Sequence, residues 1–193
     1  MSPRDYFNDL LDDVLKNVDQ FEIHPFSKVY LLDLLNNFLH VDSLFTKNVN
    51  GKIESKMLSE LFFESQALES TIKIQKLKKL AETTLYVSGF FASSLNRKIV
   101  NQSYYVQVGA MVYSSLSSAV DSDQKTGDLY KHFAHHFLDY ADVLTEVSHK
   151  ANIQKSNDVL EMFGRYLDTG SQWAEKLLIQ NGIPLQPLKK TSN

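Results

Sequence analysis

The sequence contains no cysteine, and only 4 prolines and 7 glycines occur among its 193 residues. The lack of cysteine excludes disulfides, thiol nucleophiles and cysteine metal sites, and it is compatible with a reducing compartment. Because proline and glycine mark turns, their scarcity favours helices over a β fold with many turns. The N-terminal segment MSPRDYFNDLLDD also lacks the basic start and apolar core of a signal peptide, so we expect a cytoplasmic protein.

A strong positive charge is lacking as well. The formal net charge is -3, and lysine and arginine are scattered along the chain, so the basic surface typical of a nucleic-acid-binding protein is not expected. Residues 101–120, in the longest uncharged run, contain Gln107 and several serines, whereas a membrane-spanning helix needs about 20 predominantly apolar residues. We therefore expect no nucleic-acid partner and no membrane span.

Apolar and aromatic residues are plentiful. They make up 43% and 11% of the chain, which is enough at this length for one sizeable core. Residues 83–120 are nearly uncharged except for Arg97 and Lys98. Two segments that overlap this stretch, residues 72–95 and 103–120, should form helices that are buried on more than one side. Small residues recur within them at four-residue spacing, which lets helices approach closely. We expect a central hairpin in which residues 88–93 meet residues 109–118.

Further segments have the apolar spacing of amphipathic helices. The sequence thus predicts an all-α, single-domain helical bundle of six to eight helices around a central buried helical hairpin. This domain should cover residues 1–183 and be followed by a flexible C-terminal tail, residues 184–193. Residues 42–53 form either a hairpin or a loop. The segments with helical spacing outside the hairpin are residues 3–18, 26–41, 54–67, 128–151, 159–167 and 172–180.

Several residues indicate where helices begin and end. Ser2 and Pro3 supply an N-cap and a proline at the first helical position. Thr126 or Asp128 should cap the helix that runs to about residue 151. Asn181-Gly182 is typical of a helix C-terminus.

Two pairs of residues have the spacing of metal ligands on a helix. His132 and His136 are one turn apart and could share a metal through their imidazoles. Glu146 and His149 match the Glu-x-x-His spacing of carboxylate-bridged di-iron bundles, which carry that motif twice. The alternative is that the histidines are hydrogen-bonded core residues and that Glu146 and His149 are solvated surface residues.

The segment Val108-Gly-Ala-Met-Val-Tyr-Ser-Ser-Leu-Ser-Ser resembles the Gly-, Ala- and Tyr-bearing helices of haem-oxygenase-like bundles. This resemblance implies a tetrapyrrole inside a helical bundle. It covers only about ten residues, and the proximal histidine of that family has no clear counterpart here.

A second resemblance covers residues 85–100 together with Tyr104, Tyr105 and Gly109. The patterns Ser-Gly-Phe-Phe, Ser-Leu-Asn-Arg-Lys and Tyr-Tyr are similar to those of a group of uncharacterised all-helical bacterial proteins. The resemblance implies a soluble bacterial protein with the central hairpin as its signature, and it implies no activity. Arg97 lies in this stretch and could bind a carboxylate or phosphate, with Tyr104 and Tyr105 around a small-molecule site. The alternative is that Arg97 lies in a solvated hinge between the two helices.

Nucleophile elbows, phosphate-binding loops and His-Glu-x-x-His are absent from the sequence. The leading hypothesis is therefore a cytoplasmic interaction or regulatory protein without catalytic activity of its own and without a cofactor. Its partner would be another protein or a second copy, bound through an apolar face of an outer helix. The alternative is an iron- or tetrapyrrole-binding helical-bundle enzyme or carrier, ferritin-like or haem-oxygenase-like, with its site near His132, His136, Glu146 and His149.

Overall fold

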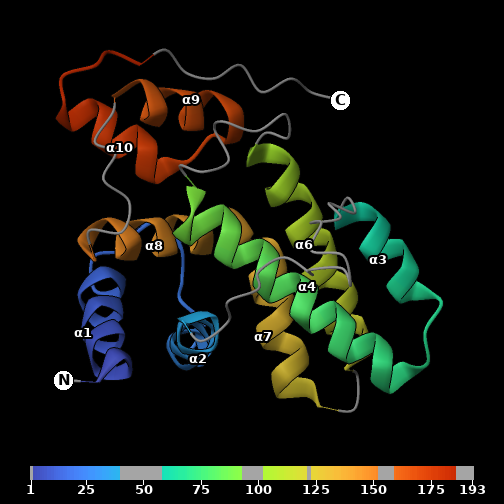
Figure 1. Cartoon of the computed structure of the whole chain (residues 1–193). Coiled ribbons are helices and arrows are strands. Elements are labelled where there is room, and N and C mark those ends of the chain that lie inside the picture. Colours follow the sequence, from blue (N-terminus) through green and yellow to red (C-terminus); the bar gives the residue numbers. More distant parts are fainter. Residues whose placement is uncertain (1, 40–57, 93–101, 121–122, 152–158, 186–193) are drawn as a thin grey trace, which may run out of the picture.

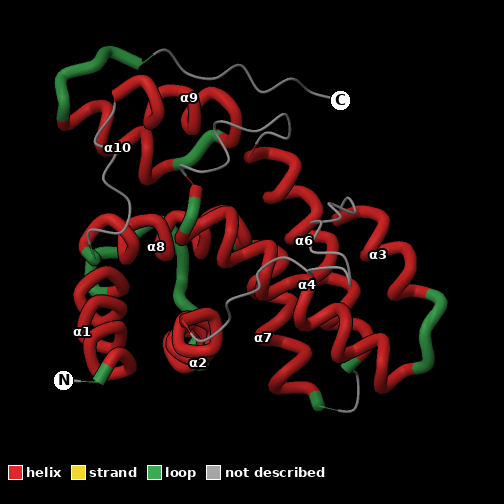
Figure 2. Tube along the Cα trace, in the orientation of Figure 1, coloured by secondary structure: helices red, strands yellow, loops and turns green. Residues whose placement is uncertain are grey.

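The computed structural model describes residues 2–39, 58–92, 102–120, 123–151 and 159–185. Within these ranges the chain forms nine α-helices and no strand, so the all-α prediction is confirmed (Figures 1 and 2). The predicted hairpin or loop at residues 42–53 lies outside the described residues. The helices are α1 (Pro3–Leu15), α2 (Ser27–Leu39), α3 (Leu58–Gln66), α4 (Ser70–Phe90), α6 (Gln102–Ala119), α7 (Gln124–His135), α8 (Phe137–Lys150), α9 (Val159–Thr169) and α10 (Gln172–Gln180).

The main core is built around α4, which packs against both α6 and α8, while α7 packs against α6. Every residue from Thr84 to Phe90 is buried, as expected for a helix that is covered on more than one side. At the centre of this packing, no surface is exposed on Leu85 of α4, Val112 of α6 or Leu144 of α8. None of the described helices is both long enough and apolar enough to cross a membrane.

The glycines of α4 and α6 both face α8, which differs from the expected contact between residues 88–93 and 109–118. A Cβ atom on Gly89 would lie 2.6 Å from Cβ of Leu144, and one on Gly109 would lie 2.2 Å from Cζ of Phe137. The helices α4 and α6 also pack on each other, but small-residue spacing did not identify α8 as the helix that approaches the two glycines.

A break at His136 separates α7 from α8, although the spacing predicted one continuous helix to residue 151. His136 has φ -112° and ψ 31°, yet its N–H still donates to the His132 carbonyl at 3.0 Å and its carbonyl accepts from Tyr140 N–H at 3.0 Å. The break therefore costs little hydrogen bonding. Because of the break, α7 packs against α6 while α8 runs toward α1 and α4 (Figure 1). Across the break, the Phe133 ring of α7 stacks on the Tyr140 ring of α8 with centroids 4.1 Å apart.

Helix caps agree with the sequence at two of the three predicted ends. The Ser2 hydroxyl accepts from Asp5 N–H at 3.1 Å, which confirms the predicted start of α1. Asn181 is the C-cap of α10, and Gly182 follows it with φ 76°. The cap of α7 is Asp123 rather than Thr126 or Asp128, because its carboxylate accepts from Thr126 N–H at 3.4 Å.

The C-terminal helices α9 and α10 pack on each other around a small apolar core of their own, made of Met162, Tyr166, Ala174 and Leu178. In Figure 1 these two helices lie above α8, with α1 on the other side of α8. Leu185 still packs against this small core, and residues 186–193 of the predicted tail lie outside the described residues.

Candidate functional site

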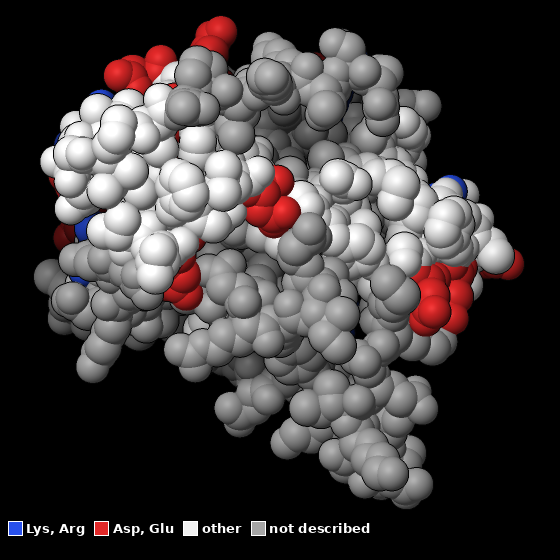
Figure 3. Space-filling view, turned by 90° about the horizontal axis from the view of Figure 1, so that it is seen from above, with Lys and Arg blue, Asp and Glu red and all other residues white. Residues whose placement is uncertain are grey.

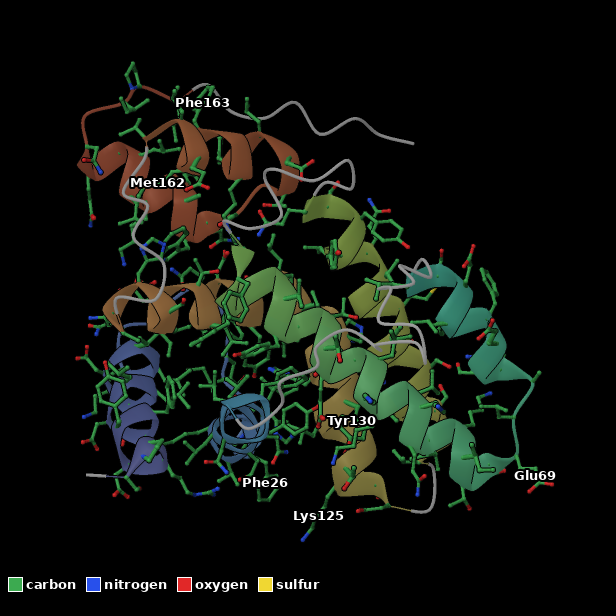
Figure 4. All side chains as sticks on the ribbon, in the orientation of Figure 1. Phe26, Glu69, Lys125, Tyr130, Met162 and Phe163 are labelled. Carbon is green, nitrogen blue, oxygen red and sulfur yellow. The ribbon has the colours of Figure 1, made fainter. Side chains whose placement is uncertain are left out.

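The outer side of α9 carries a row of exposed apolar side chains. Leu160 is 78% exposed, Phe163 37% and Leu167 53%, and their spacing of three and four residues places them on one side of the helix. The opposite side is buried and includes Met162. Figure 4 shows Phe163 on the outer side of α9 and Met162 on the side that faces the rest of the molecule. The helix is therefore apolar on both sides, and its outer side is exposed.

Gly164 lies within this row and leaves a shallow gap in it. A Cβ atom at Gly164 would have no heavy atom within 4 Å, so another helix can approach the backbone closely at this point. Figure 3 looks down on α9 and α10 and shows a broad area of uncharged side chains there. We call the surface formed by Leu160, Phe163, Gly164 and Leu167 the α9 face. A contiguous exposed apolar surface of this kind marks interaction sites more often than isolated apolar residues do.

Beneath the α9 face, a buried ion pair joins the C-terminal helices to α8. Arg165 of α9 donates from Nε to Oδ1 of Asp142 at 3.1 Å, and Ser171, the N-cap of α10, donates its hydroxyl proton to Oδ2 of Asp142 at 2.8 Å. Burial raises the pKa of Asp142, while Arg165 and Ser171 oppose that shift. These contacts tie α9 to α8 and to the start of α10 beneath the α9 face.

His132 and His136, predicted as metal ligands, belong to an aromatic cluster. Their ring centroids are 4.6 Å apart, and the ring of His24 lies 5.5 Å from that of His132. Phe21 stacks on His136 at 5.0 Å, and Nδ1 of His136 lies 2.9 Å from Oδ2 of Asp139. Burial lowers the pKa of His132, and so do His136 and His24. The arrangement favours a neutral His132 that packs like an aromatic ring.

Glu146 and His149 instead surround Trp173 of α10. Oε2 of Glu146 accepts from the indole Nε1 at 2.6 Å, and the His149 ring centroid lies 5.2 Å from that of Trp173. Burial lowers the pKa of His149. Since Glu146 follows His136 by ten residues, the two lie about 15 Å apart along α8.

The four predicted metal ligands thus form two separate pairs. Within the described ranges, no group of three or more histidine, aspartate or glutamate side chains is arranged to hold a metal ion. The iron or tetrapyrrole hypothesis therefore keeps only its sequence spacing as support.

Of the predicted small-molecule site, Arg97 lies outside the described residues. The Tyr104 hydroxyl accepts from Ser59 N–H at 3.1 Å and donates to the Ser59 hydroxyl at 3.2 Å, which ties α6 to α3. The ring of Tyr105 lies perpendicular to that of Tyr104, and burial raises the Tyr105 pKa. Binding of a ligand by these three residues stays a prediction.

No family model, curated protein or solved structure matches this chain. Functional inference therefore depends on geometry alone. Sequence reasoning missed the α9 face, although a signal was present: residues 159–167 hold more apolar side chains than one side of a helix can carry. It also missed the ion pair between Asp142 and Arg165, for which no local pattern exists because the residues are 23 positions apart.

Proposed function

We propose that this protein is a non-catalytic interaction protein that binds a helix through the α9 face, and that this helix is α9 of a second copy. The proposal is carried by the exposure of Leu160, Phe163 and Leu167 on a helix whose inner side is already packed. Burying apolar surface contributes about 25 cal/mol per Å². Covering this row would therefore favour association through α9.

The order of residues on the α9 face supports a second copy as the partner. In an antiparallel pair with a two-fold axis between positions 163 and 164, Leu160 faces Leu167 of the other copy, and Phe163 faces the other Gly164. Such self-complementarity is what a two-fold symmetric interface requires. The open space at Gly164 is the place where the opposing Phe163 ring fits.

Charges on α9 do not obstruct this pairing. Glu161 and Asp168 lie beside the apolar row rather than within it, at the angle set by the helical repeat. Oδ2 of Asp168 also accepts from Ser103 N–H at 2.8 Å, so this carboxylate is directed toward α6.

Disulfide crosslinking tests the antiparallel pairing, because the chain has no cysteine and each introduced thiol is unique. Leu160→Cys and Leu167→Cys variants should crosslink when mixed and oxidised, whereas either variant alone should crosslink poorly. The reason is that a disulfide requires Cα atoms roughly 4.4–6.8 Å apart, and only position 160 with position 167 meets that condition. Asp9→Cys, on the exposed side of α1, is the matched control and should remain uncrosslinked.

Light scattering on the unmodified protein provides the second measurement. A dimer that dissociates in the Leu167→Glu variant, with an unchanged helical circular dichroism spectrum, agrees with the proposal. A strict monomer at every concentration, with no crosslink in the mixture, overturns the second copy as partner. Crosslinking of either single variant with itself overturns the antiparallel arrangement.

A further inference from the structure

Gly164 lies near the middle of α9, where a single copy of the protein has no need of a glycine. Glycine weakens a helix interior relative to alanine, because it loses more backbone entropy when the helix forms. The backbone of α9 is helical at this position, so no left-handed conformation calls for glycine. A Cβ atom at Gly164 would have no heavy atom within 4 Å. A larger side chain would therefore fit here in the isolated protein.

The other described glycines each have a local explanation. α8 covers Gly89 and Gly109, where a Cβ atom would lie 2.6 Å and 2.2 Å from the nearest heavy atom. Gly170 and Gly182 have φ of 70° and 76°, which other residues rarely adopt. At Gly127 a Cβ atom would lie 3.6 Å from a carbonyl oxygen of α6. Among the glycines in the described helices, the one at position 164 is thus the one that faces open space.

Phe163 places a large ring directly beside this gap. Its side chain is 37% exposed and lies on the outer side of α9 (Figure 4). Consecutive residues of an α-helix differ by about 1.5 Å along the axis and about 100° around it. The α9 face therefore carries a projection and a gap next to each other. Two copies of such a surface can interlock, since each supplies what the other lacks.

The short length of α9 makes the fit at its centre decisive. The helix has 11 residues and is about 16 Å long. Its exposed row has only three large apolar side chains, Leu160, Phe163 and Leu167, whereas a standard interface buries about 800 Å² on each partner. With so few contacts, one poorly fitting side chain at the centre would prevent stable pairing.

We infer that Phe163 and Gly164 determine which helix the α9 face accepts, and that they select a second copy of α9. The accepted helix must present a gap opposite Phe163 and a bulky side chain opposite Gly164. A helix with a large side chain opposite Phe163 would clash, and one with a small side chain opposite Gly164 would leave a cavity. This inference rests on the proposed antiparallel pair and adds the residues that make it self-selective.

Two complementary substitutions test this assignment. Gly164→Leu fills the gap, and Phe163→Ala removes the projection, so each homodimer should dissociate at least about tenfold more readily than the unmodified dimer. A mixture of the two variants should recover at least about tenfold in affinity over either homodimer. In the mixed dimer one native contact between Phe163 and Gly164 remains, and at the other contact the introduced leucine packs over the introduced alanine.

Energy transfer between labelled chains measures these affinities. Because the chain has no cysteine, Asp9→Cys on the exposed side of α1 provides a unique position for a donor or an acceptor dye. The matched control is a mixture of Gly164→Leu with Leu160→Ala. This mixture should show no recovery, since Leu160 faces Leu167 of the other copy and not Gly164. Circular dichroism of each variant should match that of the unmodified protein, because both positions are exposed.

The outcomes separate this inference from the proposed function. If the unmodified protein dimerises but the mixture of Gly164→Leu with Phe163→Ala shows no recovery, the selective role of the two residues is wrong and the α9 pair still stands. An undiminished Gly164→Leu homodimer has the same meaning. A strict monomer of the unmodified protein at every concentration overturns the α9 pair and this inference together.

Discussion

The main core and the α9–α10 unit are stabilised in different ways. The main core consists of interlocked aromatic and aliphatic side chains, such as Phe133 stacked on Tyr140 at 4.1 Å and Tyr113 stacked on Phe133 at 5.3 Å. Among the described residues, the C-terminal unit has four buried apolar residues of its own. It depends in addition on the buried pair of Arg165 and Asp142.

The difference follows from size. Two short helices cannot bury much apolar area between them, so a buried charge pair fixes their position on α8. Once paired, such charges are costly to separate, because removing one partner leaves the other desolvated. The outer side of α9 carries the exposed apolar residues Leu160, Phe163 and Leu167. The C-terminal unit is thus the part of the molecule where attachment is polar and the free surface is apolar.

The largest predicted effect concerns this buried pair. Asp142→Ala should lower the free energy of unfolding by about 3–5 kcal/mol, because the Arg165 guanidinium stays buried without its partner. Chemical denaturation measures this loss. Asp33→Ala, which breaks an exposed ion pair with Arg4, is the control and should cost at most about 1 kcal/mol. Equal losses in the two variants would contradict a special role for the pair.

Replacing both charged residues sharpens the same comparison. The double variant Asp142→Leu with Arg165→Met should recover most of the stability lost in Asp142→Ala, since apolar replacements of buried ion pairs are often neutral. If stability returns but limited proteolysis now cleaves within residues 159–185, the ion pair orients the C-terminal unit. If proteolysis is unchanged, apolar packing suffices to orient it.

An intermediate effect is expected from two glycine substitutions that contrast the two regions. Gly89→Ala should lose about 1–3 kcal/mol of unfolding free energy, because its Cβ would lie 2.8 Å from the Ala141 carbonyl oxygen, a backbone atom. Gly164→Ala should instead gain up to about 1 kcal/mol, since its Cβ meets no atom within 4 Å and alanine favours the helix. Thermal and chemical unfolding of both variants in a Leu167→Glu background, which removes the proposed α9 pairing, provide the measurement. A loss at Gly164 there would contradict the open outer surface.

The smallest predicted effect is the dependence of stability on pH. The pKa values of His132 and His149 are lowered in the folded protein, mainly by burial. The unfolded chain therefore binds protons more readily, so their contribution is complete above the unfolded pKa of about 6.5 and is lost as the pH falls through the lower folded pKa. His132→Gln should flatten the acidic side of the stability curve. His135→Gln, at an exposed position, should leave that curve unchanged.

Much of the fold could be predicted because it depends on local patterns. The apolar spacing located the helices within a few residues, and the caps at Ser2 and at Asn181-Gly182 marked true ends. The break at His136 could not be predicted, because no proline or glycine marks it and its cause is the separate packing of α7 and α8. The number of helices was underestimated for the same reason, because the helix predicted to run to residue 151 is divided into α7 and α8.

The candidate sites also differ in whether local sequence patterns or tertiary contacts bring their residues together. The four residues predicted as metal ligands were grouped by spacing on one helix, but the structure assigns them to two different clusters. Phe21 and Trp173, which line a cleft beside α8, come from segments outside α8 and carry no shared motif. The α9 face is the site that the sequence could have revealed, because its excess of apolar residues is local.

The sequence by itself determined which segments become helices, where several of them end, and that a large aromatic core is present, because these features depend on residues within a few positions of each other. Only the tertiary structure decided that α8 packs against Gly89 and Gly109 and that Asp142 pairs with Arg165. It also decided which side of α9 is exposed. Those contacts join residues that are distant along the chain. Their free energy depends on the packing of whole helices, which no local pattern encodes.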